Sequence, residues 1–269
     1  MRRSLSFTTG VGLTGSLLVI TLAGLVWTPY PPLQIDTQAR FESPSFAHLL
    51  GTDQLGRDVL SNIIAGARTT LLAALLATAI ALVIGTFLGI TAAASRRWLD
   101  DAIMSLATVF VAFPALLLAL VIVAARGPST ATVVLTVGIA AGASIAVVTR
   151  REAADILHSP FVTAARYSGS STWAIVRTHM LRNLFASLTV QATGAASIAI
   201  VAESTLSYLG LGATPPTPSW GRMLASTQQY VLVHPLLVLW PALLISVAVV
   251  GATLLGDGLR ERLDPTLAT

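Results

Sequence analysis

The side chains that could do chemistry are few in this sequence, and they do not gather into a known catalytic or metal-binding pattern. The four histidines are far apart, and there is no cysteine. Disulfides, thiolate metal sites and cysteine catalysis are therefore excluded. The sequence contains no HExxH motif, no GxSxG motif and no phosphate-binding P-loop. We expect no catalytic residue, no metal site and no cofactor in this chain.

One polar loop brings two carboxylates and an arginine close together, at Asp53, Arg57 and Asp58. They could form a fixed ion pair or a small ion site, although calcium prefers more oxygen ligands than two carboxylates supply. The alternative is a turn at Gly56 followed by a helix that begins near Asp58, where the helix dipole favours an acidic side chain. The spacing favours the turn and the helix over the ion site.

The composition indicates that membrane-spanning elements position these side chains. Of 269 residues, 54% are hydrophobic and only 10% are charged, and the mean hydropathy is +0.79. A soluble domain usually has about 25% charged residues, so the membrane class comes first. All basic residues are arginine. In a membrane protein, excess arginine marks cytoplasmic loops, which argues against a nucleic-acid partner.

Six apolar runs are long enough to span a bilayer: one that ends at Trp27, then 70–94, 102–125, 130–149, 184–202 and 236–255. Each has about 20 residues, which as a helix crosses roughly 30 Å of hydrocarbon. Helices are expected because backbone polar groups cannot stay unpaired in lipid. The first run is too long for the core of a cleaved signal peptide and ends in Trp27 and Tyr30, so we predict an uncleaved first span.

The distribution of arginines predicts the orientation of these spans. With the N-terminus inside, eleven arginines fall in cytoplasmic segments, beginning with Arg2 and Arg3, and five fall outside. This asymmetry favours cytoplasmic N- and C-termini. The predicted organisation begins with an N-terminal tip and the first span (1–28), followed by an extracytoplasmic loop (29–66) and a core of five helices (67–262). A cytoplasmic loop (150–183) lies within that core.

Three residues near the outer end of the fifth span are candidates for contact with a substrate or with an extracytoplasmic protein. Glu203 is a carboxylate at the end of an apolar run, where a role in function is the default hypothesis. Its position also allows hydration or an ion pair with an arginine. Tyr208 and Trp220 follow in a segment too apolar for a free loop. Packing of this segment against the spans is the alternative to a contact surface.

Three separated segments carry a resemblance to a known family. They are HLLGTDQLGRDVLSNIIAGARTTL, ESTLSYLGLGATPPTPSWGRML and LLGDGLRERLDP, in this order. The sequence resembles the DppC/OppC-type permease subunits of bacterial dipeptide and oligopeptide ABC importers over nearly the whole chain beyond residue 45. The resemblance implies an all-α integral membrane protein with six transmembrane helices. It also implies the type I ABC importer permease fold, with a cytoplasmic coupling helix.

The family pattern of the coupling loop is E-A-A, three residues, G, nine residues, then I-x-L-P. In this sequence its positions are occupied by Thr163, Ala164, Ala165, Gly169, His179, Leu181 and Arg182. The alanines, the glycine and the leucine are kept, whereas the Glu, Ile and Pro are replaced. A literal EAA begins at Glu152, but His158 stands where its glycine should be. We therefore reject that segment.

The resemblance implies that this loop docks into a groove on an ATP-hydrolysing subunit. The docking residues would be Thr163, Ala164, Ala165, Arg166, Tyr167 and Gly169. Alanines permit close approach, glycine permits a turn that a side chain would hinder, and Pro160 is expected to break the incoming helix. Without the family spacing, an ordinary amphipathic cytoplasmic loop would be the interpretation.

The function implied is that of a translocation subunit, not an enzyme, which moves peptides across the bacterial cytoplasmic membrane by alternating access. The expected partners are a second, DppB/OppB-type permease, ABC ATPase subunits that bind ATP and Mg²⁺, an extracytoplasmic solute-binding protein and membrane lipid. Transporters of this type also carry haem, nickel, glutathione or other small solutes, so these remain alternatives. A passive channel and a membrane enzyme are the rivals from other classes.

Overall fold

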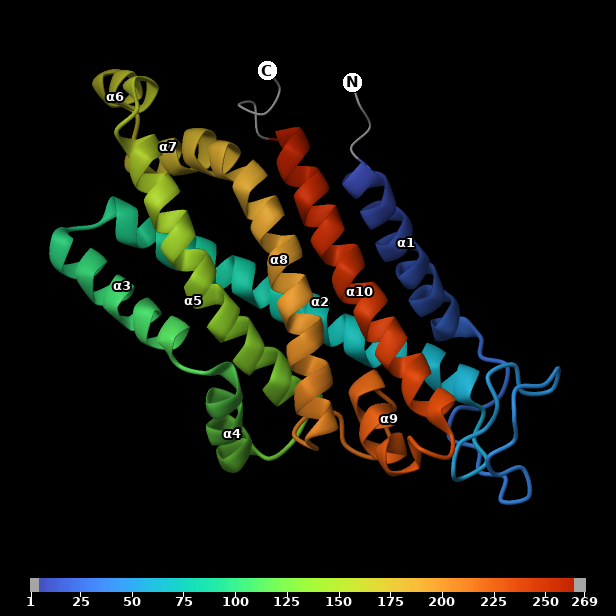
Figure 1. The fold of residues 1–269 in the computed structure, drawn as a ribbon. Helices are drawn as coiled ribbons and strands as arrows, with labels where there is room; N and C mark the ends of the chain where they lie inside the picture. Colours follow the sequence, from blue (N-terminus) through green and yellow to red (C-terminus); the bar gives the residue numbers. More distant parts are fainter. Residues whose placement is uncertain (1–4, 264–269) are drawn as a thin grey trace.

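A computed structural model describes residues 5–263, which fold into helices joined by loops (Figure 1). The long helices are α1 (Leu5–Val26), α2 (Val59–Ala94), α3 (Arg97–Ala112), α4 (Ala115–Arg126), α5 (Thr130–Leu157), α8 (Leu181–Tyr208) and α10 (Pro235–Leu263). The short ones are α6 (Pro160–Tyr167), α7 (Thr172–Ile175), a π-helical turn (Val176–Met180), α9 (Trp220–Thr227) and a 3-10 turn (Gln228–Tyr230). Arg2 and Arg3 lie outside the described residues.

The helices form a bundle with two distinct ends. In Figure 1, α6 and α7 lie at one end, together with the start of α1 and the end of α10. The opposite end carries α4, α9 and the long loop between α1 and α2. We call these the α6 end and the α9 end. Helix α1 packs along α10, α10 packs on α8, and α2 crosses the bundle to pack on α5 and α8.

Five of the six predicted spans are present as continuous helical segments, whereas the third corresponds to two helices separated by a sharp bend. In residues 5–263, five helical segments are long and apolar enough to cross a membrane: α1, α2, α5, the continuous 172–208 segment and α10. Helices α3 and α4, bent by 95° relative to each other, make a sixth if the pair counts as one span. The break falls at Pro114, because proline lacks an N–H and disfavours helical geometry at the preceding residue; Phe113 is accordingly extended, with ψ 126°.

The second span begins earlier than the predicted run 70–94. Helix α2 starts at Val59, because the Asp58 carboxylate accepts the Ser61 backbone N–H at 2.8 Å and caps it. The prediction of a helix beginning near Asp58 is therefore confirmed. At 36 residues, α2 extends well beyond its apolar run.

Helices α2 and α5 touch through glycines, which brings their backbones close together. Each carries a G-x-x-x-G pair, at Gly85 and Gly89 on α2 and at Gly138 and Gly142 on α5. A Cβ built on Gly85 would lie 2.5 Å from the Ile145 Cβ and 2.7 Å from the Gly142 carbonyl oxygen. Small residues at such crossings permit close helix packing in membranes. This contact fixes α5, and therefore α6, relative to α2.

We expect Gly85→Leu to destabilise the bundle by about 1–3 kcal/mol, the usual cost of overpacking. The new side chain would collide with backbone as well as with Ile145, so the two helices must separate. The measurement is the thermal unfolding midpoint of the purified protein in detergent. Gly12→Leu is the control, since nothing lies within 4 Å of a Cβ built there. Equal midpoints for the two variants would contradict the proposed close contact.

A second link ties α3 to α5. The Arg150 Nε donates to Asp100 Oδ1 at 3.0 Å, and the Arg150 Nη2 contacts Asp100 Oδ2. Such a two-point arginine–carboxylate pair fixes orientation as well as distance. Asp100 lies in the first turn of α3, where the helix dipole favours a carboxylate. The pair shows that it also holds the broken third span against α5.

Candidate functional site

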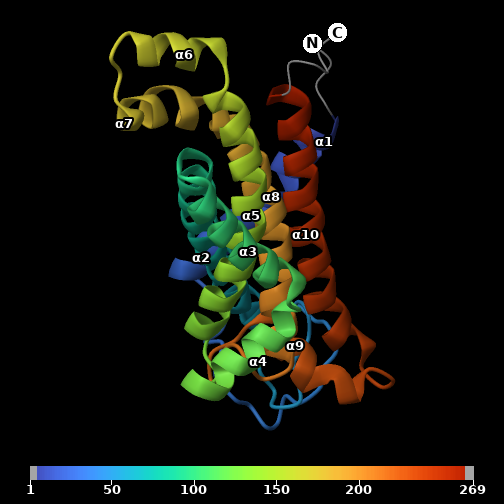
Figure 2. The same ribbon diagram turned by 90° about the vertical axis from the view of Figure 1, so that its left-hand side faces the viewer.

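The predicted coupling loop contains a short helix, α6, that stands apart from the bundle. Figure 2 shows α6 beyond the end of α5 and α7 beside that end, both projecting to one side of the bundle. Helix α5 ends at Leu157, and Pro160 occupies the first turn of α6. Proline is favoured there because its missing N–H would be unpaired in any case. The predicted break of the incoming helix is therefore present just before Pro160.

Gly169 ends α6 in a left-handed conformation, with φ +83°. Its N–H donates to the Arg166 carbonyl at 3.0 Å, and the Ser170 N–H donates to the Ala165 carbonyl at 3.0 Å. These two bonds form a Schellman motif, which satisfies carbonyls that would otherwise lack partners at the helix end. The turn predicted at Gly169 is thus observed. Nothing lies within 4 Å of a Cβ built there, so the glycine is required by conformation, not by crowding.

One side of α6 is anchored and the other is open. Val162 is fully buried. Of the residues predicted to dock, Ala165 is half-buried; Thr163, Ala164, Arg166 and Gly169 are exposed, and Tyr167 is 90% exposed. The predicted residues therefore lie together on a surface that the chain itself leaves uncovered.

The far end of the motif forms the π-helical turn that leads into α8. Met180 is fully buried against Ala153 of α5 and Leu184 of α8. The His179 ring, in the position of the family isoleucine, lies 5.7 Å from the Phe161 ring of α6. The His179–Phe161 contact joins α6 to the π-helical turn, and Met180 joins that turn to α5 and α8. Sequence reasoning missed Phe161 and Val162, although an apolar pair next to Pro160 could have suggested an anchor.

Glu203 lies in the interior, 2% exposed, and not at a hydrated boundary. The Ser207 hydroxyl donates to its Oε1 at 2.7 Å. Thr70 of α2 faces the same carboxylate, and Oε2 has no hydrogen-bond partner within the described residues. The expected hydration or arginine pairing is therefore not what residues 5–263 show. In this conformation Glu203 is closed off from a substrate.

Trp220 is also removed from the contact surface. Its ring is fully buried, and its Nε1–H donates to the Ile63 carbonyl of α2 at 3.0 Å. This burial favours the packing alternative for this residue over a contact with a partner. Tyr208 remains exposed, and its hydroxyl donates to Gln228 Oε1.

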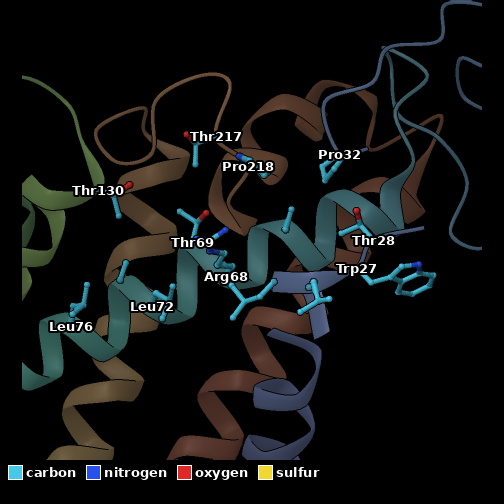
Figure 3. A pocket seen from close by; sticks show the side chains of 15 residues that line it. Trp27, Thr28, Pro32, Arg68, Thr69, Leu72, Leu76, Thr130, Thr217 and Pro218 are labelled. Carbon is cyan, nitrogen blue, oxygen red and sulfur yellow. The ribbon is translucent and has the colours of Figure 1, made fainter. Parts of the chain in front are cut away.

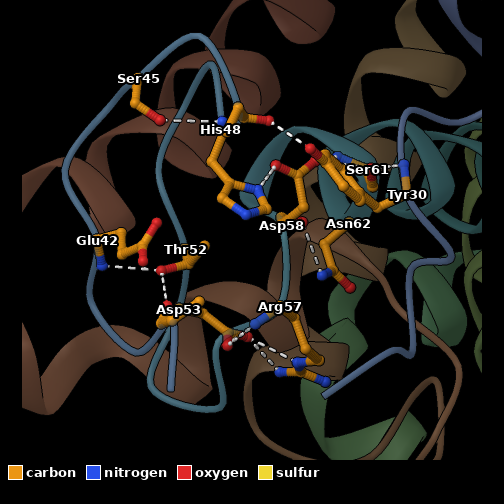
Figure 4. A network of polar contacts seen from close by, with 12 residues as sticks. Tyr30, Glu42, Ser45, His48, Thr52, Asp53, Arg57, Asp58, Ser61 and Asn62 are labelled. Carbon is orange, nitrogen blue, oxygen red and sulfur yellow. Dashed lines mark hydrogen bonds and ion pairs between the residues drawn. The ribbon is translucent and has the colours of Figure 1, made fainter. Parts of the chain in front are cut away.

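The polar loop before α2 is held by internal contacts (Figure 4). Arg57 Nη2 lies 2.7 Å from Asp53 Oδ2, and Gly56, at φ +72°, donates its N–H to the Asp53 carbonyl at 3.0 Å. The His48 Nδ1 lies 2.9 Å from Asp58 Oδ1. The predicted turn at Gly56 is confirmed. Both carboxylates are engaged in shaping the loop and starting α2.

A groove runs along α5 and α8 and was not predicted. A cavity of about 490 Å³ lies between the α3–α4 break, α5 and α8. A second, of about 680 Å³, lies between α5, α8 and α10 toward the α6 end. Val148 and Gln191 line both cavities, so the two cavities adjoin along α5 and α8. We call the two together the α5–α8 groove.

A polar network crosses the α5–α8 groove. The Ser187 hydroxyl donates to Glu152 Oε1 at 2.6 Å, and the Gln191 amide donates to the Ser187 oxygen at 3.1 Å. Glu152 is the residue rejected as a motif glutamate, and the structure gives it this separate role. Nothing in the sequence indicated that Glu152 and Gln191 would line the same cavity.

The family described as the binding-protein-dependent transport system inner membrane component matches residues 85–269. The chain belongs to this family. It is a multi-pass inner membrane permease, a translocation component of an ABC importer and not an enzyme.

Relatives of this permease span almost the whole chain. The di/tripeptide transport system permease protein DppC of Pseudomonas aeruginosa is 39% identical, over 95% of this chain and 87% of its own. The glutathione transport system permease protein GsiD of Pectobacterium atrosepticum is 35% identical, over 94% and 86%. The nickel transport system permease protein NikC of Escherichia coli is 33% identical, over 94% and 94%. The predicted resemblance to DppC-type permeases is confirmed.

Proposed function

We propose that this permease imports peptides and that α6 is the helix through which partner ATPases drive it. The observation that supports this most is the exposed surface of α6, fixed by the Schellman turn at Gly169. We place the α6 end in the cytoplasm. The arginines of α6, of the turn before α8 and of the last turn of α10 support this orientation.

Motion of α6 would reach the α5–α8 groove through side-chain contacts. Val162 is buried at the base of α6, and Phe161 meets His179 at the start of the α8 segment. A displacement of α6 by an ATPase subunit therefore acts on α5 and α8 together. ATP and Mg²⁺ would be bound by those subunits. Coupling of this kind requires two states with different contacts.

The α5–α8 groove is our candidate for one wall of the translocation pathway. A second, DppB/OppB-type permease would supply the other wall. A solute-binding protein would deliver substrate at the α9 end. In support, the groove runs between helices that both connect to α6, and its Ser187, Gln191 and Glu152 side chains can hydrogen-bond to a passing solute.

Peptides suit the groove because they present amide groups and a terminal ammonium. The amide of Gln191 and the hydroxyl of Ser187 can pair with peptide amides, and Glu152 and Asp155 can attract an ammonium group. A relative named for di- and tripeptides points the same way. Glutathione, nickel and haem are the alternative solutes.

The test is uptake by the whole transporter, reconstituted in liposomes with its binding protein. We expect a labelled dipeptide to accumulate only when ATP is enclosed with the ATPase subunits. Nickel or haem uptake without dipeptide uptake would overturn the substrate assignment. Failure of any ATPase or second permease to co-purify with the chain would overturn the coupling role.

A further inference from the structure

A cavity at the α9 end is not used by the coupling or translocation elements. It has a volume of about 570 Å³ and lies between the end of α1, the first part of α2 and the loop before α9 (Figure 3). Arg68, Thr69 and Thr217 are among its polar residues, and Leu72 and Leu76 of α2 continue it along the helix. We call it the Arg68 groove.

The Arg68 groove lies at the level of a membrane interface. Arg68 lies two residues before the apolar run that begins at residue 70, so we place it at the edge of the hydrocarbon region on α2. Trp27, which ends the apolar run of α1, lines the same groove. Tryptophan and arginine are both favoured at the headgroup level, with their apolar parts toward the bilayer. Leu72 and Leu76 are exposed and lie one and two turns deeper.

The charge in the groove is positive and unpaired. The Arg68 side chain is exposed and makes no hydrogen bond or ion pair with residues 5–263. None of the described residues lining the groove is acidic. A guanidinium binds phosphate through two parallel hydrogen bonds, and neighbouring hydroxyls can add others. An apolar wall below such a cation fits an acyl chain.

We propose that the Arg68 groove binds an anionic phospholipid. The phosphate lies on the Arg68 guanidinium and on the hydroxyls of Thr69 and Thr217, and one acyl chain lies along Leu72 and Leu76. A net negative headgroup is favoured because the groove carries one positive charge and no negative one among its described lining residues. Free inorganic phosphate would satisfy Arg68 but would leave the leucine wall unused. The site does not depend on which solute is transported.

The experiment uses the purified transporter complex in detergent. Native mass spectrometry measures binding of phosphatidylglycerol and phosphatidylcholine, and thermal unfolding measures stabilisation by each lipid and by inorganic phosphate. We expect phosphatidylglycerol to bind more tightly than phosphatidylcholine. Arg68→Gln should weaken it about tenfold, the effect of losing a charge-assisted hydrogen bond. Arg68→Lys should recover part of the affinity, because the charge stays while the fork geometry is lost.

The matched control is Arg126→Gln, which removes an exposed arginine at the same end of the bundle but outside the groove. It should leave phosphatidylglycerol binding unchanged. Equal losses in Arg68→Gln and Arg126→Gln would overturn the proposal, and so would no loss in either. Equal stabilisation by inorganic phosphate would also overturn it, by showing an anion site without a lipid.

Discussion

A Gly169→Val variant should insert and assemble normally but take up substrate roughly 5- to 30-fold more slowly. Valine at φ +83° places a Cβ in the left-handed region, at a cost of about 1–2 kcal/mol. The turn is expected to relax into another conformation, which breaks the Schellman bonds and reorients the exposed surface of α6. If this ~1–2 kcal/mol is lost from the docking of α6 to the ATPase, the fraction of transporters coupled to an ATPase falls about 5- to 30-fold. Uptake and substrate-stimulated ATP hydrolysis in proteoliposomes measure it.

Gly127 provides a matched control for this experiment. It has φ +81° and ψ 162°, a region that is essentially restricted to glycine, and nothing lies within 4 Å of a Cβ built there, so Gly127→Val carries at least as much backbone strain. It lies after α4, at the opposite end of the bundle. Gly169→Asn is the second control, because asparagine tolerates the left-handed region. Normal uptake by Gly169→Val, or an equal loss in Gly127→Val, would contradict a specific role for the α6 turn.

Local sequence signals predicted the features that depend on a few neighbouring residues. The turn at Gly169 and the helix start after Asp58 follow from backbone preferences and capping, which act within one turn of chain. The spans follow from apolar run length, because lipid requires internal backbone pairing. The break at Pro114 was visible in the sequence but was overridden by the uninterrupted apolarity of 102–125.

Contacts between distant segments could not be predicted in the same way. Asp100 and Arg150 meet because α3 folds back along α5, and the sequence gives no register for that packing. Glu152 and Gln191 are joined through Ser187 for a similar reason. Glu203 was placed near water from its position in an apolar run, but α2 covers it. One sequence without related sequences carries no information on which polar residues pair across a bundle.

Trp220→Ala should give the largest loss of stability. The ring is fully buried, and truncating a buried tryptophan usually costs about 3–5 kcal/mol in lost contacts and cavity. The ring lies on Gly66 of α2, where a Cβ would come 3.1 Å from Trp220 Cδ1. The Ile63 carbonyl would also lose its 3.0 Å hydrogen bond from Nε1. The thermal midpoint and the yield of the purified protein in detergent measure the effect.

Two further variants test whether burial of the Trp220 ring is what stabilises the bundle. Trp220→Phe keeps most of the ring but removes the donor, so its loss should be about 1–3 kcal/mol, the cost of an unpaired buried acceptor. Trp173→Ala removes a tryptophan that is 72% exposed, and it should change the midpoint little. If Trp220→Ala behaved like Trp173→Ala, the ring would not hold α9 against α2. Residue 220 would then return to the candidates for contact with a partner. If the losses rank as expected, α9 is fixed to the bundle by this ring, and the end of α8 that precedes it is fixed as well.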